Sequence, residues 1–110
     1  MKIIYIASPY SIGDIAANVA RQMEVAHLIM DAGHCPIVPL MSHYLHIYRR
    51  RPYQEWLNCD LALIPKVDLV VRLPGESKGA DQEVALAESL NIPVVFGLVE
   101  LLNDLNDSPL

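Results

Sequence analysis

The feature that most constrains the fold is a short apolar run that stops abruptly and is followed by helical periodicity. Residues 67–73 (VDLVVRL) are mostly apolar and β-branched, which is typical of a parallel strand covered on both faces. Pro74 and Gly75 end this strand, and the spacing of apolar positions then predicts a helix over residues 80–90, with an inner face of Ala80, Val84, Ala87 and Leu90. The stretch therefore predicts a strand, a tight turn and a helix in direct succession.

The turn of this unit carries residues that suit a ligand site. Ser77 and Gly79 fit a tight turn, with Ser77 near the helix N-cap and Glu83 near the first helical turn. Open α/β sheets bind their ligands at the carboxyl ends of strands. A carboxylate at this position therefore invites a chemical interpretation.

The alternation of strands and helices recurs along all 110 residues. Further strands are predicted over residues 2–7, 34–40 and 92–96, and the two prolines of the second place it at an edge or strand end. Further helices are predicted over residues 14–30, 52–64 and 99–105, with a partly helical loop over 42–53 and a frayed tail over 106–110. This order predicts one domain, residues 1–110, built as a three-layer α/β/α sandwich with a four- or five-stranded parallel sheet, flavodoxin-like or Rossmann-like.

The apolar spacing also predicts which helix residues face the core. A helix that begins at Asp14, and that ends before a left-handed cap at Gly33, is expected to bury Ile15, Val19, Met23, Ala26 and Met30. A helix that begins near Pro52 is expected to bury Trp56, Leu57, Leu61 and Ile64.

The composition excludes several classes of partner and location. A net charge of -5 and a pI near 5.2 argue against a binder of nucleic acid polymers or anionic membranes, which needs a basic face. No apolar run reaches the roughly 18 residues of a membrane span, and the first apolar run is too short for a signal peptide, so a cytoplasmic location is expected. Cys35 and Cys59 lack a Cys-x-x-Cys spacing and are interpreted as buried free thiols.

In a parallel sheet, the turns after residues 7, 40 and 73 would lie along one edge. We expect the crevice there to bind a small-molecule nucleoside or nucleotide through Ser8, Tyr10, Ser11, His43, Ser77 and Gly79. Two helix N-termini at this edge would aim backbone N–H groups at a phosphate or ribose oxygen. Neither loop matches a Walker A or G-x-G-x-x-G pattern, the histidines and cysteines make no convincing metal set, and no cofactor is expected.

Two acidic residues are candidates for catalysis. Glu83, beside a helix N-terminus, is expected to favour its charged form and to act as a nucleophile or ion stabiliser. Asp60 lies in an otherwise apolar segment, where partial burial would raise its pKa and let it carry a proton to a leaving group. The alternatives are that Glu83 is a plain first-turn acid, that Asp60 is exposed or pairs with Arg72, and that Tyr5 only packs in the core.

Three motifs follow one another along the chain: IIYIASPYS with Tyr5, DLALIPKVD with Asp60, and SKGADQE over residues 77–83. Their order resembles the nucleoside 2-deoxyribosyltransferase superfamily, including its 2'-deoxynucleoside 5'-monophosphate N-glycosidase branch. It implies that Glu83 attacks C1' of the sugar, that Asp60 acts as acid/base on the leaving base, and that Tyr5 orients the nucleophile. Transferases of this superfamily usually carry Asp where Ser77 stands and the monophosphate hydrolases carry Ser, which favours hydrolysis or phosphate recognition.

Other interpretations remain open beside this one. The first loop, SPYS, lacks the glycines and arginine of the hydrolases, and Val84-Ala85 replaces a small-Gly pair after the nucleophile, so a non-catalytic nucleotide-binding or oligomerisation module is the alternative. The turn LPGESKGADQE also loosely resembles that of the cytokinin-activating phosphoribohydrolases. Within the aromatic and basic residues 43–56, His43, His46, Tyr44 and Tyr48 fit either a wall of the site that stacks on a base or a subunit contact. Arg49–Arg51 are interpreted as a solvated face, with an anionic substrate or a neighbouring subunit as the alternative, and a homodimer or higher homo-oligomer is expected.

Overall fold

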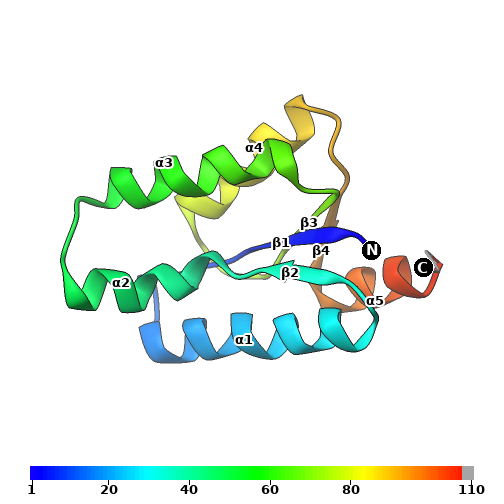
Figure 1. Cartoon of the computed structure of the whole chain (residues 1–110), viewed down its shortest axis with the longest axis horizontal. Helices are drawn as coiled ribbons and strands as arrows, with labels where there is room; N and C mark the ends of the chain where they lie inside the picture. Colours follow the sequence, from blue (N-terminus) through cyan, green and yellow to red (C-terminus); the bar gives the residue numbers. More distant parts are fainter. Residues whose placement is uncertain (108–110) are drawn as a thin grey trace.

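A four-stranded, all-parallel sheet forms the centre of the computed structural model, which describes residues 1–107 (Figure 1). The strands lie in the order β2-β1-β3-β4, and their bounds are Ile3–Ala7 for β1, Cys35–Ile37 for β2, Leu69–Arg72 for β3 and Val94–Phe96 for β4. In the register, Tyr5 of β1 pairs with Ile37 of β2 and with Val70 of β3. The chain order reverses between β1 and β3, which is the switch point where such sheets bind ligands.

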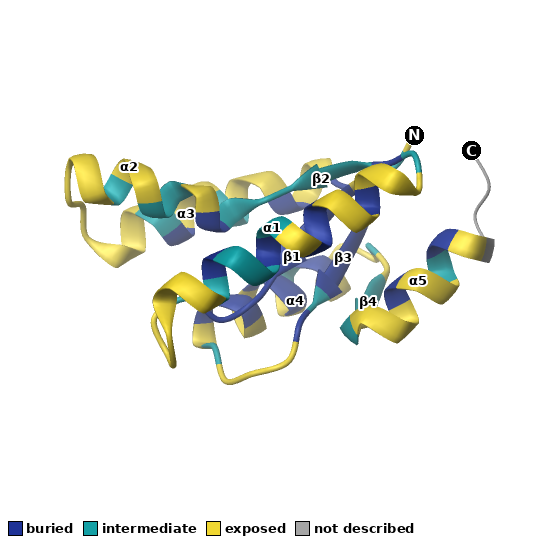
Figure 2. Ribbon diagram, turned by 90° about the horizontal axis from the view of Figure 1, so that it is seen from below, coloured by how far each residue is buried: buried dark blue, intermediate teal, exposed yellow. Residues whose placement is uncertain are grey.

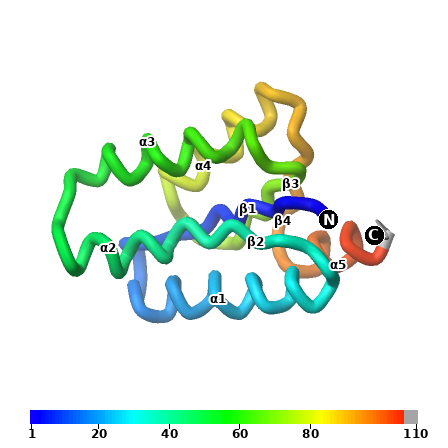
Figure 3. The backbone as a smooth tube through the Cα atoms, viewed as in Figure 1, coloured from blue at the N-terminus to red at the C-terminus, as the bar shows by residue number. Residues whose placement is uncertain are grey.

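Helices cover both faces of this sheet, which confirms the predicted three-layer α/β/α sandwich. One face carries α1 (Ile15–Asp31) and α5 (Gly97–Asp107), and the other carries α3 (Tyr53–Leu63) and α4 (Lys78–Ser89) (Figure 1). The remaining elements are α2 (Ser42–Tyr48) and two 3-10 segments, η1 (Pro39–Met41) and η2 (Ile64–Lys66). Figure 3 shows that α2 and the start of α3 extend past the end of the sheet that lies opposite the N-terminus.

The alternation of side chains along β1 divides the core into two halves. Ile4 and Ile6 pack with residues of α1 and α5, whereas Tyr5 and Ala7 pack with residues of η2 and α4. The four side chains are fully buried. Tyr5 therefore points into the layer that also carries Asp60 and Glu83.

The start and stop signals of the helices act as predicted. The Asp14 carboxylate accepts a hydrogen bond from the backbone N–H of Ala17 at 3.0 Å, and the Ser77 hydroxyl accepts one from Ala80 at 3.1 Å. Gly33 follows α1 with φ +85°, the left-handed conformation that favours glycine. These caps place the N-termini of α1 and α4 just after the ends of β1 and β3.

The buried face of α1 differs from the prediction. Val19 and Ala26 are buried, but Ile15 and Met30 are exposed and Met23 is only half-buried. The other buried positions are Gln22, Val25 and Ile29. The apolar stripe of this helix is wide, so the sequence allows two choices for the side that faces the core. The polar Gln22 lies on the side that is buried, and its polarity made that side look like the exposed one.

Several boundaries also differ from the prediction. β2, at the sheet edge, ends at Ile37 because Pro39 begins a 3-10 turn. Residues 42–48, predicted to belong to a partly helical loop, form α2. The helix predicted over residues 52–64 is α3, which ends at Leu63. β3 spans only residues 69–72, and Leu90, predicted to lie inside, caps α4 and is 45% exposed. Trp56 and Leu61 are half-buried, and Cys59 is exposed rather than buried.

The C-terminal helix is longer than the prediction. It runs from Gly97 to Asp107, so Asn106 lies in a helix and not in a frayed tail, while residues 108–110 of that predicted tail lie outside the described part of the chain. None of the helices within residues 1–107 is both long and apolar enough to cross a membrane.

Candidate active site

A cavity of about 440 Å³ opens beside the ends of β1, β2 and β3. Its volume lies within the range of about 300–1,000 Å³ that small-molecule sites occupy. All six side chains or backbone positions predicted to bind substrate line it, as do both candidate carboxyl groups: Ser8, Tyr10, Ser11, His43, Ser77, Gly79, Asp60 and Glu83. The fold thus brings together residues that are up to 75 positions apart, counted from Ser8 to Glu83.

The Tyr5 hydroxyl donates a hydrogen bond to Oε2 of Glu83. Tyr5 lies on β1 and Glu83 on α4, and both side chains are buried, with Glu83 only 5% exposed. Burial and the neighbouring carboxyl groups of Glu83 and Asp60 raise the pKa of Tyr5, which keeps its hydroxyl protonated as a donor. The contact expected from an orienting tyrosine is therefore present.

The prediction that Glu83 favours its charged form is wrong. Its pKa is raised to about 8, and burial is the largest cause. The Tyr5 hydrogen bond lowers the pKa, the Asp60 carboxylate raises it, and the Arg72 guanidinium lowers it. The helix begins at Lys78, so Glu83 lies in its second turn, and the field of the helix N-terminus falls off within the first. Desolvation therefore exceeds the helix dipole at this position.

Asp60 has the environment that its apolar surroundings predicted. Burial raises its pKa to about 7. The alternative of a pair with Arg72 is excluded, because the Arg72 guanidinium bonds instead to Asp81 at 3.0 Å. Asp60 and Glu83 face one cavity and influence each other's charge, so their protons titrate as a coupled pair.

A buried glutamine positions the first loop of the site. The Gln22 side chain, on α1, is fully buried and donates to the Ile6 carbonyl at 2.9 Å and to the Ser8 hydroxyl at 2.8 Å. Its carbonyl oxygen accepts from the backbone N–H of Leu40 at 3.1 Å. Gln22 thus ties the end of β1 to η1, the segment that follows β2, and leaves the Ser8 hydroxyl hydrogen able to reach a ligand.

Aromatic and imidazole rings form the outer wall of the cavity. The Tyr10 hydroxyl lies 2.5 Å from Nδ1 of His43, and His46 accepts at Nδ1 from the Trp56 indole N–H at 2.9 Å. The same His46 nitrogen accepts from the Arg51 backbone N–H at 3.2 Å. Two donors on Nδ1 require the tautomer with its proton on Nε2. Of the proposed wall residues, Tyr44 and Tyr48 are exposed and do not line the cavity.

Tyr53 is a site residue that the sequence did not reveal. It lines the cavity, and its hydroxyl occupies the space where a side chain on Gly79 would begin. Burial, followed by the charges of Glu83 and Asp60, raises its pKa. Gly79 is therefore required at the start of α4 so that this hydroxyl can approach the two carboxyl groups.

The overlooked residues differ in the signals that they carried. Gln22 stood as a polar residue within an apolar helical stripe, which is the pattern of a buried side chain with structural hydrogen bonds. Trp56 was expected in the core and Tyr53 had no marker of its own, since both line the cavity only because α3 packs beside α4. Among residues 1–107, no three His, Cys, Asp or Glu side chains are grouped to hold a metal ion.

The comparisons with known proteins give a family but no activity. The model of the DUF7768 family, described as a domain of unknown function, matches residues 2–97. That range contains every residue that lines the cavity, together with Tyr5. No curated protein matches the chain.

Proposed function

We infer that this chain, which belongs to the DUF7768 family of domains of unknown function, cleaves or transfers the N-glycosidic bond of a nucleoside or nucleoside 5'-monophosphate. The observation that carries this proposal is the pairing of Glu83 and Asp60, two carboxyl groups with raised pKa values, in one cavity with a tyrosine donor on Glu83. Cleavage at an anomeric carbon needs one carboxylate at that carbon and one acid at the leaving group. The resemblance to the nucleoside 2-deoxyribosyltransferase superfamily supports the same assignment of roles.

In the proposed reaction, Glu83 is the nucleophile and Asp60 the acid. A Glu83 oxygen forms a bond to C1' of the sugar while the bond from C1' to the base nitrogen breaks, and the electron pair of that bond leaves with the base. The Asp60 carboxyl delivers its proton to the base as it departs. Water or a second base then attacks C1' and releases Glu83, with Asp60 taking up the proton.

The proton has to be moved before this reaction can begin. Burial raises the pKa of Asp60 to about 7 and is the main cause that raises the pKa of Glu83 to about 8, so the pair retains a proton near neutral pH. The reaction needs this proton on Asp60 and an ionised Glu83, and ionising a buried carboxyl group has a cost. Positive charge that develops at C1' favours the ionised Glu83 and offsets this cost.

The loops of the cavity suggest how the rest of the substrate binds. Ser8, Ser11 and Ser77 offer hydroxyl groups, and the N-termini of α1 and α4 lie close to them, a combination that suits phosphate or sugar oxygens. Tyr10, His43 and Trp56 offer ring faces and edges to a base. We assign the serine side to the sugar and phosphate and the aromatic side to the base.

Incubation with deoxynucleosides and their 5'-monophosphates, with free base followed by chromatography, tests the proposal. We expect base release by the wild-type chain and none by Glu83→Gln, which should still bind the substrate. Ligand-induced thermal stabilisation without product, equal in the wild type and in Glu83→Gln, would instead establish the non-catalytic nucleotide-binding module. Absence of both product and binding would overturn the proposal.

We also propose that a second copy of the chain covers α2. No residue of this helix is buried, and the side away from the cavity exposes Tyr44, Leu45, Ile47 and Tyr48, with Ile47 63% and Tyr48 92% exposed. Figure 2 shows this helix without buried positions at one end of the molecule. Exposed apolar clusters of this kind mark protein contacts, and His43 and His46 on the same helix line the cavity.

A further inference from the structure

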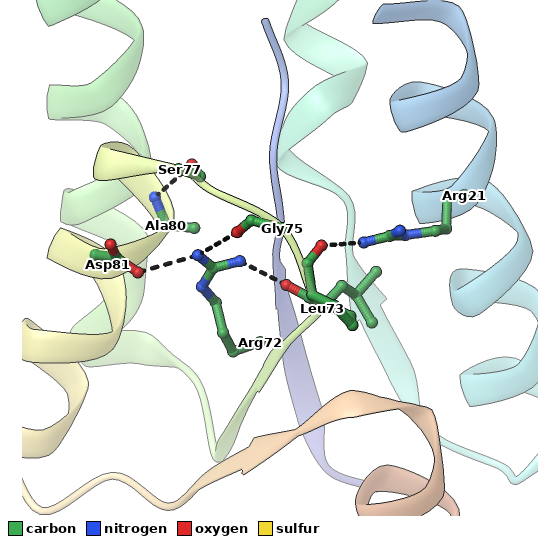
Figure 4. A network of polar contacts seen from close by, with 8 residues as sticks. Arg21, Arg72, Leu73, Gly75, Ser77, Ala80 and Asp81 are labelled. Atoms are coloured by element: carbon green, nitrogen blue, oxygen red, sulfur yellow. Dashed lines mark hydrogen bonds and ion pairs between the residues drawn. The ribbon is translucent and has the colours of Figure 1, made fainter. Parts of the chain in front are cut away.

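Arg72 connects the end of β3 to the loop and the helix that carry the site. Its side chain is only 11% exposed, and its guanidinium donates to the Leu73 carbonyl at 2.5 Å, to the Gly75 carbonyl at 2.8 Å and to the Asp81 carboxylate at 3.0 Å. Figure 4 shows these contacts converging on one guanidinium group. Such a group can satisfy acceptors on both the loop and α4 because its donors diverge in a rigid plane.

A second arginine holds the same loop from the opposite layer. Arg21, on α1, donates to the Pro74 carbonyl at 2.6 Å, and Figure 4 shows it reaching the loop from the side away from α4. Three successive carbonyls, those of Leu73, Pro74 and Gly75, are thus bound by two guanidinium groups. Charge-assisted hydrogen bonds of this kind are about twice as strong as neutral ones.

The loop held in this way sets the position of the cavity residues that follow it. Gly75 has φ +121° and packs against Pro9 of the first loop, whose Cγ lies 2.6 Å from where a Cβ on Gly75 would be. Ser77 follows as the N-cap of α4, and Glu83 lies in the second turn of that helix. A shift of the loop would therefore displace Ser77 and Glu83 together.

We propose that Arg72, assisted by Arg21, is a positioning residue: it fixes the loop over residues 73–77 against α4 so that Ser77 and Glu83 are held in the cavity. This inference rests on the proposed function for its effect on turnover, but its structural content is independent of that function. Arg72 does not line the cavity and touches no group that reacts. It acts through the loop and through the Asp81 carboxylate.

The charge of Arg72 adds a second effect that can be measured without any substrate. The groups that act on Glu83 are the Tyr5 hydroxyl from β1, the Asp60 carboxylate from α3 and the Arg72 guanidinium from β3, and among them Tyr5 and Arg72 favour the ionised form. Loss of the guanidinium should therefore make Glu83 hold its proton to higher pH. A residue that only stabilised the fold would leave the titration of Glu83 unchanged.

The experiment compares Arg72→Met, Arg72→Lys and Arg21→Met with the wild type. Lys66→Met is the control, because it removes one positive charge from an exposed position of η2 away from the site. Two readouts need no activity: the pH titration of the Glu83 carboxyl carbon by NMR, and hydrogen exchange of the backbone amides over residues 75–80. The third readout is kcat and KM for base release.

We expect Arg72→Met to raise the titration midpoint of Glu83 by about half a pH unit or more and to speed loop exchange. Arg72→Lys should retain the midpoint but not the slow exchange, since an ammonium cannot span the same acceptors. Arg21→Met should speed exchange alone, and Lys66→Met should change neither. In the active protein, kcat should fall about tenfold or more for Arg72→Met with a smaller change in KM.

Each result bears on one claim. An unchanged Glu83 midpoint and unchanged loop exchange in folded Arg72→Met would overturn the positioning role. If Arg72→Met fails to fold, Arg72→Lys and Arg21→Met decide the matter through loop exchange, and slow exchange in both would overturn it. Lack of base release by the wild type would contradict the proposed function. The titration of Glu83 and the hydrogen exchange of residues 75–80 need no substrate and would still test the role of Arg72.

Discussion

At the scale of single residues, the buried Glu83 makes the stability of the protein depend on pH, in the same direction as Asp60. The pKa of Glu83 is about 8 in the folded protein against 4.5 for an ordinary glutamate, so the folded state binds the proton more tightly. The resulting stability is complete below pH 4.5 and is lost as the pH rises through 8. We predict that Glu83→Gln gains up to about 5 kcal/mol at pH 9 and little at pH 4, because the pKa differs by about 3.5 units between the folded and unfolded states and each unit corresponds to about 1.4 kcal/mol.

Denaturant unfolding between pH 4 and pH 9 measures this difference. Glu88→Gln is the matched control, because Glu88 is an exposed acid on the same helix. An equal pH dependence in the wild type and in Glu83→Gln would contradict the raised pKa of Glu83.

A second prediction at this scale concerns Asp60 and the rate of base release. Because the pKa values of Asp60 and Glu83 are raised to about 7 and about 8, the pair loses its protons in the neutral to weakly basic range, so the rate of base release should follow a bell-shaped pH profile in that range. Asp60→Asn should lower kcat by about 10²- to 10⁴-fold, most strongly for bases that leave poorly, because it cannot deliver a proton. Steady-state rates across a series of bases check this, and an equal loss for good and poor leaving groups would contradict the acid role.

At the scale of elements, the approach of α3 to α4 depends on a single glycine. An alanine at Gly79 would meet the Tyr53 hydroxyl, the mobile end of a side chain, while the helix itself favours alanine by about 1 kcal/mol. We predict that Gly79→Ala changes the melting temperature little but weakens nucleotide binding severalfold, because Tyr53 is displaced into the cavity. A double-mutant cycle, in which calorimetry measures nucleotide affinity, tests whether Tyr53 causes this loss. If Gly79→Ala lowers the affinity equally in the wild type and in Tyr53→Phe, the Tyr53 hydroxyl is not the cause.

At the scale of the whole molecule, α2 projects from one end and has no buried residue. We predict that Ile47→Glu converts an oligomer to a monomer without lowering the melting temperature of the monomer, because Ile47 is 63% exposed and contributes little to the core. Sedimentation velocity measures the change. Val99→Glu is the control, since Val99 is 73% exposed on α5, and a wild-type chain that is monomeric at micromolar concentration would refute the contact.

Three properties could be predicted from the amino-acid sequence: the layered α/β/α architecture, the alternation of short parallel strands with helices, and the set of residues at the strand ends. These follow from patterns between near neighbours: the apolar run that becomes β3, the caps at Asp14 and Ser77, and the glycine that ends α1. Strand order and right-handed crossovers then place the turns on one edge. The cavity-lining positions of Ser8, Tyr10, Ser11, His43, Ser77 and Gly79 were predictable for that reason.

Four properties became known only from the three-dimensional structure. They are the raised pKa of Glu83 and the ion pair of Arg72 with Asp81 instead of Asp60. The other two are the set of α1 residues that face the core and the contact between Tyr53 and Gly79. Each depends on a group that is distant in the chain. The pKa of a carboxyl group is set by how completely other elements remove it from water, and ion pairs and close contacts are set by how two elements pack. Local periodicity contains neither quantity, so the sequence located the acids of the site but not the charge that they carry.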